Sequence, residues 1–332
     1  MILDFAAEQL AAPPALSALD LGDTRELRIL REGQKNTVWA FGRVRKLFFV
    51  TGHARSGTNW LAALLMRHPS IYVDGEYYFQ ELKRGFDAFR HEAYHRAIRE
   101  PVRTVAESCF QDTVRLCIAA CAIHHPDAEW VGDRTPRPLE VFLPGAPHFV
   151  IVRDGRDVLV SLSILEIAGG GPVYHEFAHC PVLRQLREEF VKDKEFFKKN
   201  PDRLLTSEPF TRAICRRWAA QVRHDFDTIQ KIHAGEIDAS VFSITYEELH
   251  AEPERHRARM YQFLGLDPAK ALPLTVESET LPGLRGDNHS SDRRKGVVGD
   301  WHIYFTDAVR AWFKQEAGTE LIRAGYESSN DW

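Results

Sequence analysis

The sequence predicts an α/β fold in which a mostly parallel, three-layer sheet is flanked by helices. Short apolar runs alternate along the chain with segments of helical periodicity, and the apolar runs carry few polar residues. Strands that are apolar on both faces are typical of parallel sheets covered by helices. Ligands of such sheets bind at the carboxyl ends of the strands, so the residues that follow each apolar run are the candidates for function.

The predicted elements follow in a regular order. RKLFFVTG (45–52) is a buried strand, TNWLAALLMRHP (58–69) a helix stopped by proline, and SIYVDGE (70–76) a second strand. Residues 80–130 are expected to be helical, EWVGDRTP (129–136) a strand that runs into a loop, and PHFVIV (147–152) the clearest strand. A helix follows from 157, helices fill most of 183–233, and SVFSITYEELH (240–250) is a strand that leads into a helix. Residues 1–44 are assigned to an N-terminal extension and 45–332 to one domain.

Composition excludes several classes of protein. The chain has 332 residues, 43 Lys and Arg against 47 Asp and Glu, and a net charge of -4, so a nucleic-acid partner is not expected. The sequence has no apolar run near the ~20 residues of a membrane span, and its N-terminus lacks the basic start of a signal peptide. The five cysteines include no CxxC pair, which favours buried thiols and a cytoplasmic location over disulfides or a metal cluster. Oligomeric state is not specified by the sequence.

A glycine-bounded loop, GHARSG, links the first predicted strand to its helix. Gly52 and Gly57 bracket the loop, and glycine permits the backbone angles that point successive N–H groups into one concavity. Such a loop at a helix N-terminus suits a phosphate, although a tight turn without a ligand is the alternative. No lysine follows Gly57, and Thr58 and Asn59 stand where an ATP site needs Lys and a Mg²⁺ ligand. The loop therefore predicts an anion site without a metal, with its cation at Arg55.

Two further segments carry anion-binding residues. VIVRDGRDVLVSL places Arg153 at a strand end and Ser161 about two helical turns later, where the pair can hold one phosphate. The alternative is that Arg153 only pairs with Asp154 or Asp157. SDRRKGVVGDW carries three consecutive cations before Gly296, which suit a terminal phosphate or, alternatively, a solvated basic turn.

Together, GHARSGTNWL, VIVRDGRDVLVSL and RRKGVVGDWHIYFT resemble the sulfotransferases that use 3′-phosphoadenosine 5′-phosphosulfate (PAPS). The resemblance covers roughly residues 45–327 and implies the P-loop NTPase-like sulfotransferase fold, PAPS as cosubstrate, adenosine 3′,5′-bisphosphate (PAP) as product, and no metal. It implies contacts to the 5′-phosphosulfate from Arg55, Ser56, Gly57, Thr58 and Asn59, to adenine from Trp60 and Tyr246, and to the 3′-phosphate from Arg153, Ser161, Arg294, Lys295 and Gly296.

Departures from the cytosolic members concern the transfer chemistry. Those members carry lysine where Arg55 stands and a histidine base in a segment that here reads GDRTP. The loop RSGT is closer to tyrosylprotein and carbohydrate sulfotransferases, and the tyrosylprotein members place a glutamate base at the position of Glu76. The resemblance thus suggests Arg55, Glu76 and Arg134 as catalytic residues, with His124 and His125 as secondary candidates for the base.

The acceptor is not specified by the sequence. A hydroxyl on a small-molecule or carrier-bound acceptor is expected first, and an amine second. The alternatives to a sulfotransferase are a P-loop nucleotide kinase that acts on adenylylsulfate, and a sulfonucleotide-binding module without catalysis.

Overall fold

A computed structural model describes residues 27–28, 36–91, 100–274 and 296–332. Its centre is a sheet whose parallel strands lie side by side in the order β4 (Ile71–Asp74), β5 (Trp130–Arg134), β3 (Arg43–Gly52), β6 (Pro147–Val152) and β7 (Ser240–Thr245). The predicted parallel α/β sheet is confirmed. Because all five strands run in one direction, the segments after Gly52, Asp74, Arg134 and Val152 emerge at one edge.

Two short strands extend the sheet beside the start of β3. Strand β2 (Thr37–Ala40) pairs antiparallel with residues 43–46, and β1 (Leu27–Arg28) pairs with β2. The hairpin between β2 and β3 turns at Phe41 and Gly42, whose φ angles are 49° and 83°. Strand-forming residues therefore begin before residue 45, inside the segment that the sequence assigned to an extension.

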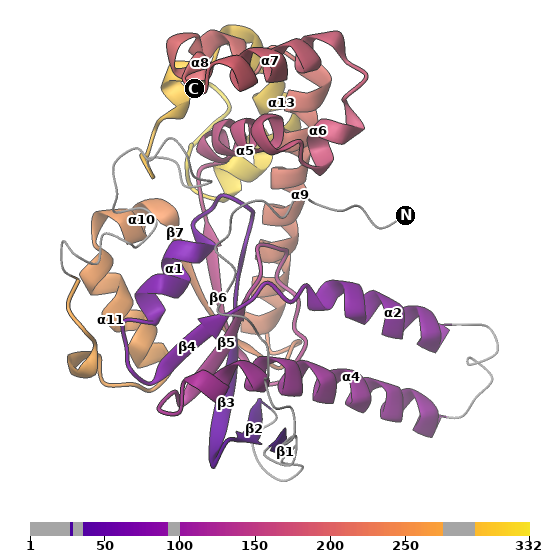
Figure 1. The fold of residues 1–332 in the computed structure, drawn as a ribbon, viewed down its shortest axis with the longest axis vertical. Helices are drawn as coiled ribbons and strands as arrows, with labels where there is room; N and C mark the ends of the chain where they lie inside the picture. Colours follow the sequence, from indigo (N-terminus) through magenta and orange to yellow (C-terminus); the bar gives the residue numbers. More distant parts are fainter. Residues whose placement is uncertain (1–26, 29–35, 92–99, 275–295) are drawn as a thin grey trace.

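Alternate residues of β3 supply two separate cores. Phe48 and Val50 pack with α1 (Thr58–Leu65), α10 (Tyr246–Ala251) and α11 (Pro253–Phe263), while Leu47 and Phe49 pack with α4 (Glu100–Ala120) and its neighbour α2 (Phe79–His91). These two groups of helices lie on opposite sides of the sheet (Figure 1). Gly132 of β5 makes room for one of the rings, because a Cβ there would lie 2.6 Å from the tip of Phe48.

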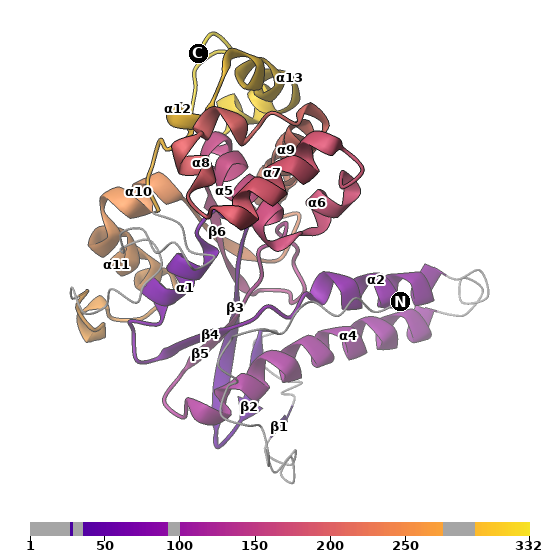
Figure 2. The same ribbon diagram turned by 45° about the horizontal axis from the view of Figure 1, so that its top comes forward.

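A third group of helices stands above the carboxyl edge of the sheet (Figures 1 and 2). Helix α5 (Gly155–Gly169) enters this group directly from β6, and its first residue packs so closely on Trp218 that a Cβ at Gly155 would lie 2.6 Å from the indole ring. The other members are α6 (Pro172–Glu176), α7 (Pro181–Lys192), α8 (Phe196–Lys199), α9 (Glu208–His233), α12 (Trp301–Tyr304) and α13 (Asp307–Arg323). Short 3₁₀ turns occur at η2 (Cys121–His124), η3 (Pro201–Arg203) and η4 (Pro268–Lys270). None of the helices in the described part of the chain is both long and apolar enough to cross a membrane.

Candidate active site

The loop between β3 and α1 has the backbone geometry of an anion cradle. Gly57 caps α1 with φ 97°, and as a glycine it has no side chain to bond the first amides of the helix. Arg55 also has a positive φ, 74°, which a residue with a side chain rarely adopts. A Cβ at Gly57 would lie 2.6 Å from Cδ2 of Tyr246, so this position requires glycine for space as well as for conformation.

Buried polar atoms without partners surround this loop. Ser56 is fully buried, and its Oγ forms no hydrogen bond; the indole N–H of Trp60, in the first turn of α1, is also buried and unpaired. Burying such groups without a partner costs about 1–3 kcal/mol each, and a bound molecule with acceptor oxygens or ring nitrogens would remove that cost. Both atoms belong to residues that the sequence predicts to hold the nucleotide, so the residues present fit a phosphorylated purine ligand.

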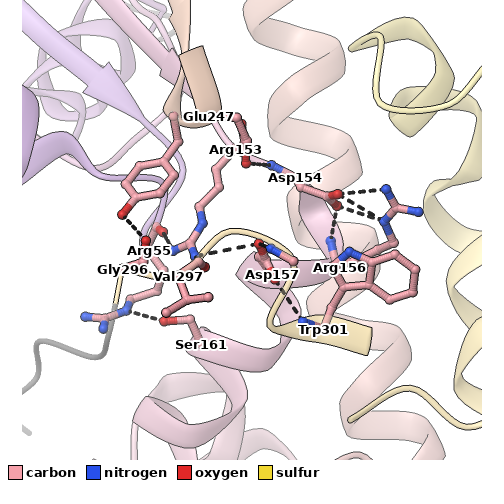
Figure 3. Close-up of polar contacts among 12 residues, drawn as sticks. Arg55, Arg153, Asp154, Arg156, Asp157, Ser161, Glu247, Gly296, Val297 and Trp301 are labelled. Atoms are coloured by element: carbon pink, nitrogen blue, oxygen red, sulfur yellow. Dashed lines mark hydrogen bonds and ion pairs between the residues drawn. The ribbon is translucent and has the colours of Figure 1, made fainter. Parts of the chain in front are cut away.

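Arg153 joins the first two predicted motifs. Its guanidinium donates hydrogen bonds to the backbone oxygen of Arg55 at 3.2 Å and to that of Val297 at 2.9 Å (Figure 3). It also lies over the ring of Tyr246, 4.4 Å from the ring centroid. Asp157 is 3.8 Å from Arg153, an ion pair too long for a good hydrogen bond. Arg153 therefore links two backbone segments at the carboxyl end of β6.

Arg55 contacts the residue that the sequence assigned to the opposite end of the nucleotide. Its Nε donates to Oγ of Ser161 at 3.0 Å, across 106 positions of sequence (Figure 3). The predicted 5′-phosphosulfate loop and the predicted 3′-phosphate helix thus share a direct contact. The structure brings the two motifs together at one place on the sheet edge.

The C-terminal motif reaches the same place, although its cations lie outside the described residues. Arg294 and Lys295, together with Arg293, belong to that undescribed stretch, and the description resumes at Gly296. The carbonyl of Gly296 accepts a hydrogen bond from the hydroxyl of Tyr246 at 2.7 Å. Trp60 packs edge-on against the same tyrosine, with ring centroids 5.2 Å apart. The two predicted adenine-pocket residues are therefore neighbours.

Glu76 follows β4 and is held by two side chains. Nη1 of Arg134, at the end of β5, lies 2.7 Å from one carboxylate oxygen, and the hydroxyl of Tyr78 donates to the other. Asp133, the neighbour of Arg134 in the sequence, could equally have been its partner, but Arg134 forms its ion pair with Glu76. Gly75 allows this approach, because a Cβ there would lie 2.4 Å from the carbonyl oxygen of Arg134. Each carboxylate oxygen has a second lone pair that remains able to accept a proton.

Asp133 directly precedes Arg134 in β5. Its side chain is buried and accepts hydrogen bonds from the Thr135 hydroxyl at 2.9 and 3.1 Å and from the Tyr77 amide at 3.4 Å. Burial raises the pKa of Asp133 to about 6, although these hydrogen bonds oppose the shift. The carboxyl group therefore holds the backbone of Tyr77 and the side chain of Thr135 in place next to Glu76.

The contacts of the two histidines named as secondary bases are with residues other than Glu76. His125 stacks on Tyr72 with ring centroids 3.5 Å apart, and His124 is exposed in η2. A third histidine, His53, lies in the loop between β3 and α1, and its Nδ1–H donates a hydrogen bond to the Ala54 carbonyl, 2.8 Å away. Burial lowers its pKa to about 4, so the ring is neutral at pH 7.

Sequence reasoning missed the residues that support the start of α5. The carboxylate of Glu247 accepts hydrogen bonds from the Asp154 amide at 3.1 Å and from the Tyr326 hydroxyl at 2.6 Å, which ties β6 to α10 and the C-terminal segment. Tyr326 is 79 residues from Glu247, and no spacing in the sequence signals the contact. The only local indication of these contacts in the sequence was the charged residue directly after Tyr246, which is Glu247.

Comparison with known families defines the class of this protein. The model described as "Sulfotransferase family" matches residues 48–206, and the model described as "Sulfotransferase domain" matches residues 138–321, more than half of the chain. The protein therefore belongs to the sulfotransferase family, and its class of reaction is sulfuryl transfer. The matched ranges include the loop between β3 and α1, Glu76, Arg134, Arg153 and the segment that begins at Gly296.

The chain also matches several solved structures. The sulfotransferase domain of the Synechococcus PCC 7002 olefin synthase is 13% identical with a TM-score of 0.44, and the alignment covers 83% of this chain and 94% of that one. Retinol dehydratase in complex with androsterone and PAP is 17% identical, with a TM-score of 0.42 and coverages of 86% and 82%. Mouse sulfotransferase SULT7A1 complexed with PAP is 20% identical, with a TM-score of 0.38 and coverages of 83% and 83%. No protein with a curated description matches the sequence.

Proposed function

We propose that this protein transfers the sulfuryl group of PAPS to a hydroxyl group of a small-molecule or carrier-bound acceptor. One observation carries the proposal: residues from three separate motifs are linked by hydrogen bonds of 2.7–3.2 Å at the carboxyl ends of the strands. These residues are Arg55, Arg153, Ser161 and Gly296, and some of the bonds run through Tyr246 and Val297. Three anion motifs at one place suit a nucleotide with phosphate groups at both its 3′ and 5′ positions. An amine remains the secondary acceptor.

In this proposal the nucleotide binds at the carboxyl ends of the neighbouring strands β3 and β6. The loop amides, Ser56, Thr58 and Asn59 hold the 5′-phosphosulfate, while Trp60 and Tyr246 form the adenine pocket. Arg153, Ser161, Arg294, Lys295 and Gly296 hold the 3′-phosphate. The orphaned hydroxyl of Ser56 and indole N–H of Trp60 support these placements, since each gains a partner when the nucleotide binds.

Transfer is an in-line displacement at sulfur. The acceptor oxygen forms a bond to sulfur as the bond from sulfur to the bridging phosphate oxygen breaks, and the acceptor proton passes to Glu76. The negative charge that develops on the departing nucleotide is stabilised by Arg55 and the loop amides. Arg134, paired with Glu76 at 2.7 Å, lies where it can also face the sulfuryl oxygens. The arginine in the loop and the glutamate after β4 support our assignment of the chain to the RSGT-type members of the family.

The proposed organisation assigns residues 45–332 to the transferase domain and residues 1–44 to an N-terminal extension, whose strands β1 and β2 continue the sheet of that domain. All five cysteines are free, which fits the reducing cytoplasm, where we place the enzyme. Cationic side chains and loop amides neutralise the nucleotide, so we expect no requirement for a divalent metal.

Transfer of ³⁵S from labelled PAPS to a library of phenols, alcohols, amines and carrier-bound hydroxyls tests the proposal. Label should pass to at least one hydroxyl acceptor without ATP. Phosphorylation of adenylylsulfate that depends on ATP and Mg²⁺ would identify a kinase instead. Tight binding of PAPS without transfer to any acceptor would identify a binding module.

A further inference from the structure

Asp157 connects α5 to a segment more than 140 residues away. One carboxylate oxygen accepts the backbone N–H of Gly299 at 2.8 Å, and the other accepts that of Trp301 at 3.0 Å (Figure 3). The side chain is 1% exposed, so both hydrogen bonds form away from water. A buried carboxylate that receives two backbone donors fixes the position of the segment that carries them.

The segment fixed by Asp157 is the one that contacts the anion site. Between Gly296 and Trp301, the carbonyl of Val297 accepts from Arg153, and the carbonyl of Gly296 accepts from Tyr246. Arg153 also lies over the Tyr246 ring and 3.8 Å from Asp157 itself. These contacts form a closed ring: Asp157 holds the backbone, the Val297 carbonyl accepts from Arg153, and the Gly296 carbonyl accepts from Tyr246, over whose ring Arg153 lies.

We propose that Asp157 is a positioning residue for recognition of the nucleotide 3′-phosphate, acting through Arg153 and the backbone of residues 296–301. This inference rests on the proposed function, since it assumes that Arg153 contacts that phosphate. Asp157 does not touch the nucleotide; its two hydrogen bonds set where the guanidinium of Arg153 points. A guanidinium clasps a phosphate only when its fork is aligned, so a small shift of the supporting carbonyl reduces the affinity for that group.

Asp157→Asn tests this role with little change in volume. The asparagine oxygen can accept one of the two N–H groups, but its NH₂ group then faces the other N–H, and two donors oppose each other. The affinities for PAP and for adenosine 5′-phosphate, measured by calorimetry, isolate the 3′-phosphate because the two ligands differ only there. We expect Asp157→Asn to weaken PAP by about tenfold and adenosine 5′-phosphate by less than about twofold.

Asp225→Asn is the matched control. Asp225 is as buried as Asp157, at 2% exposure of the whole residue, and it also accepts a long-range backbone N–H, from Leu139 at 2.6 Å. It contacts neither Arg153 nor residues 296–301 in any hydrogen bond or ion pair described for it. Asp225→Asn should therefore lower the melting temperature and leave the ratio of the two affinities unchanged.

Several outcomes would overturn the inference. Equal loss of both ligands in Asp157→Asn, or an unchanged PAP affinity, would reduce Asp157 to a structural residue. If Asp157→Asn does not fold, Asp157→Glu keeps the charge but moves the carboxylate by one methylene, and an unchanged ratio there would reject the inference equally. A wild-type protein that does not prefer PAP over adenosine 5′-phosphate would instead reject the proposed function, which keeps the two failures distinct.

Discussion

Replacement of Glu76 by glutamine separates the chemistry of this residue from its structural role. Glutamine keeps the size of the side chain and the hydrogen bond from the Tyr78 hydroxyl, but it cannot take up the acceptor proton. The change also removes the charge that faces Arg134 at 2.7 Å. Both effects fall on the acceptor side of the proposed site, whereas every predicted nucleotide contact lies outside β4 and the residues that follow it.

The two roles differ greatly in the expected magnitude. A general base contributes about 10²–10⁴-fold to the rate, so Glu76→Gln should lower turnover by that factor. The ion pair with Arg134 is partly exposed, with 29% of the Glu76 side chain and 19% of the Arg134 side chain accessible, so its loss should cost no more than about 1 kcal/mol of stability. The affinity for PAP should change by less than about threefold, because Arg55, Arg153 and Ser161 remain in place.

Initial rates of ³⁵S transfer, together with calorimetric affinities for PAP, measure both quantities. Glu129→Gln is the control: Glu129 also forms a 2.7 Å ion pair, with Lys46, but at the opposite edge of the sheet. It should lose a similar amount of stability and no activity. Turnover of Glu76→Gln within a factor of about three of the wild type would refute the assignment of the base.

Three further predictions concern the loop, the buried carboxyl group and the metal requirement. Gly57→Ala should weaken PAP binding at least about tenfold in calorimetry, since φ 97° and the Tyr246 ring at 2.6 Å leave no room for a Cβ; unchanged binding would contradict the geometry of the loop. Asp133 has a folded-state pKa of about 6, above its ordinary value of 3.8, so the folded protein favours the protonated form and loses stability as pH rises from about 4 to about 6. Asp133→Asn should remove that loss. The free energy of unfolding in urea of the variant, relative to that of the wild type, should therefore rise by up to roughly 3 kcal/mol between about pH 4 and about pH 6. Parallel pH profiles of the two proteins would contradict a raised pKa of Asp133. Turnover should persist in a chelator, and a loss that Mg²⁺ restores would show that a metal takes part.

The sequence predicted those parts of the site that depend on local pattern. An apolar run, a glycine and a helical period define β3, the loop and α1 because each is set by residues within about fifteen positions of one another. Partners across long separations were not accessible, since nothing local specifies that Arg55 meets Ser161 or that Arg134 pairs with Glu76 in preference to Asp133. Asp157 illustrates the limit: its spacing from Arg153 suggested an ion pair, whereas its principal bonds are to the backbone of residues 299 and 301.

The order of the strands gives a physical reason for the proposed division of labour. Glu76 follows β4 and the phosphate loop follows β3, and β5, which ends at Arg134, lies between them. Neighbouring strands lie about 4.8 Å apart, so two spacings separate the base from the loop by about 10 Å at the sheet edge. An in-line displacement needs such a span, because the acceptor oxygen, the sulfur and the departing oxygen must lie on one line between the base and the loop. In this proposal Arg134 stands beside the middle of that line, next to the oxygens of the transferring group, and its ion pair with Glu76 orients the base toward the acceptor.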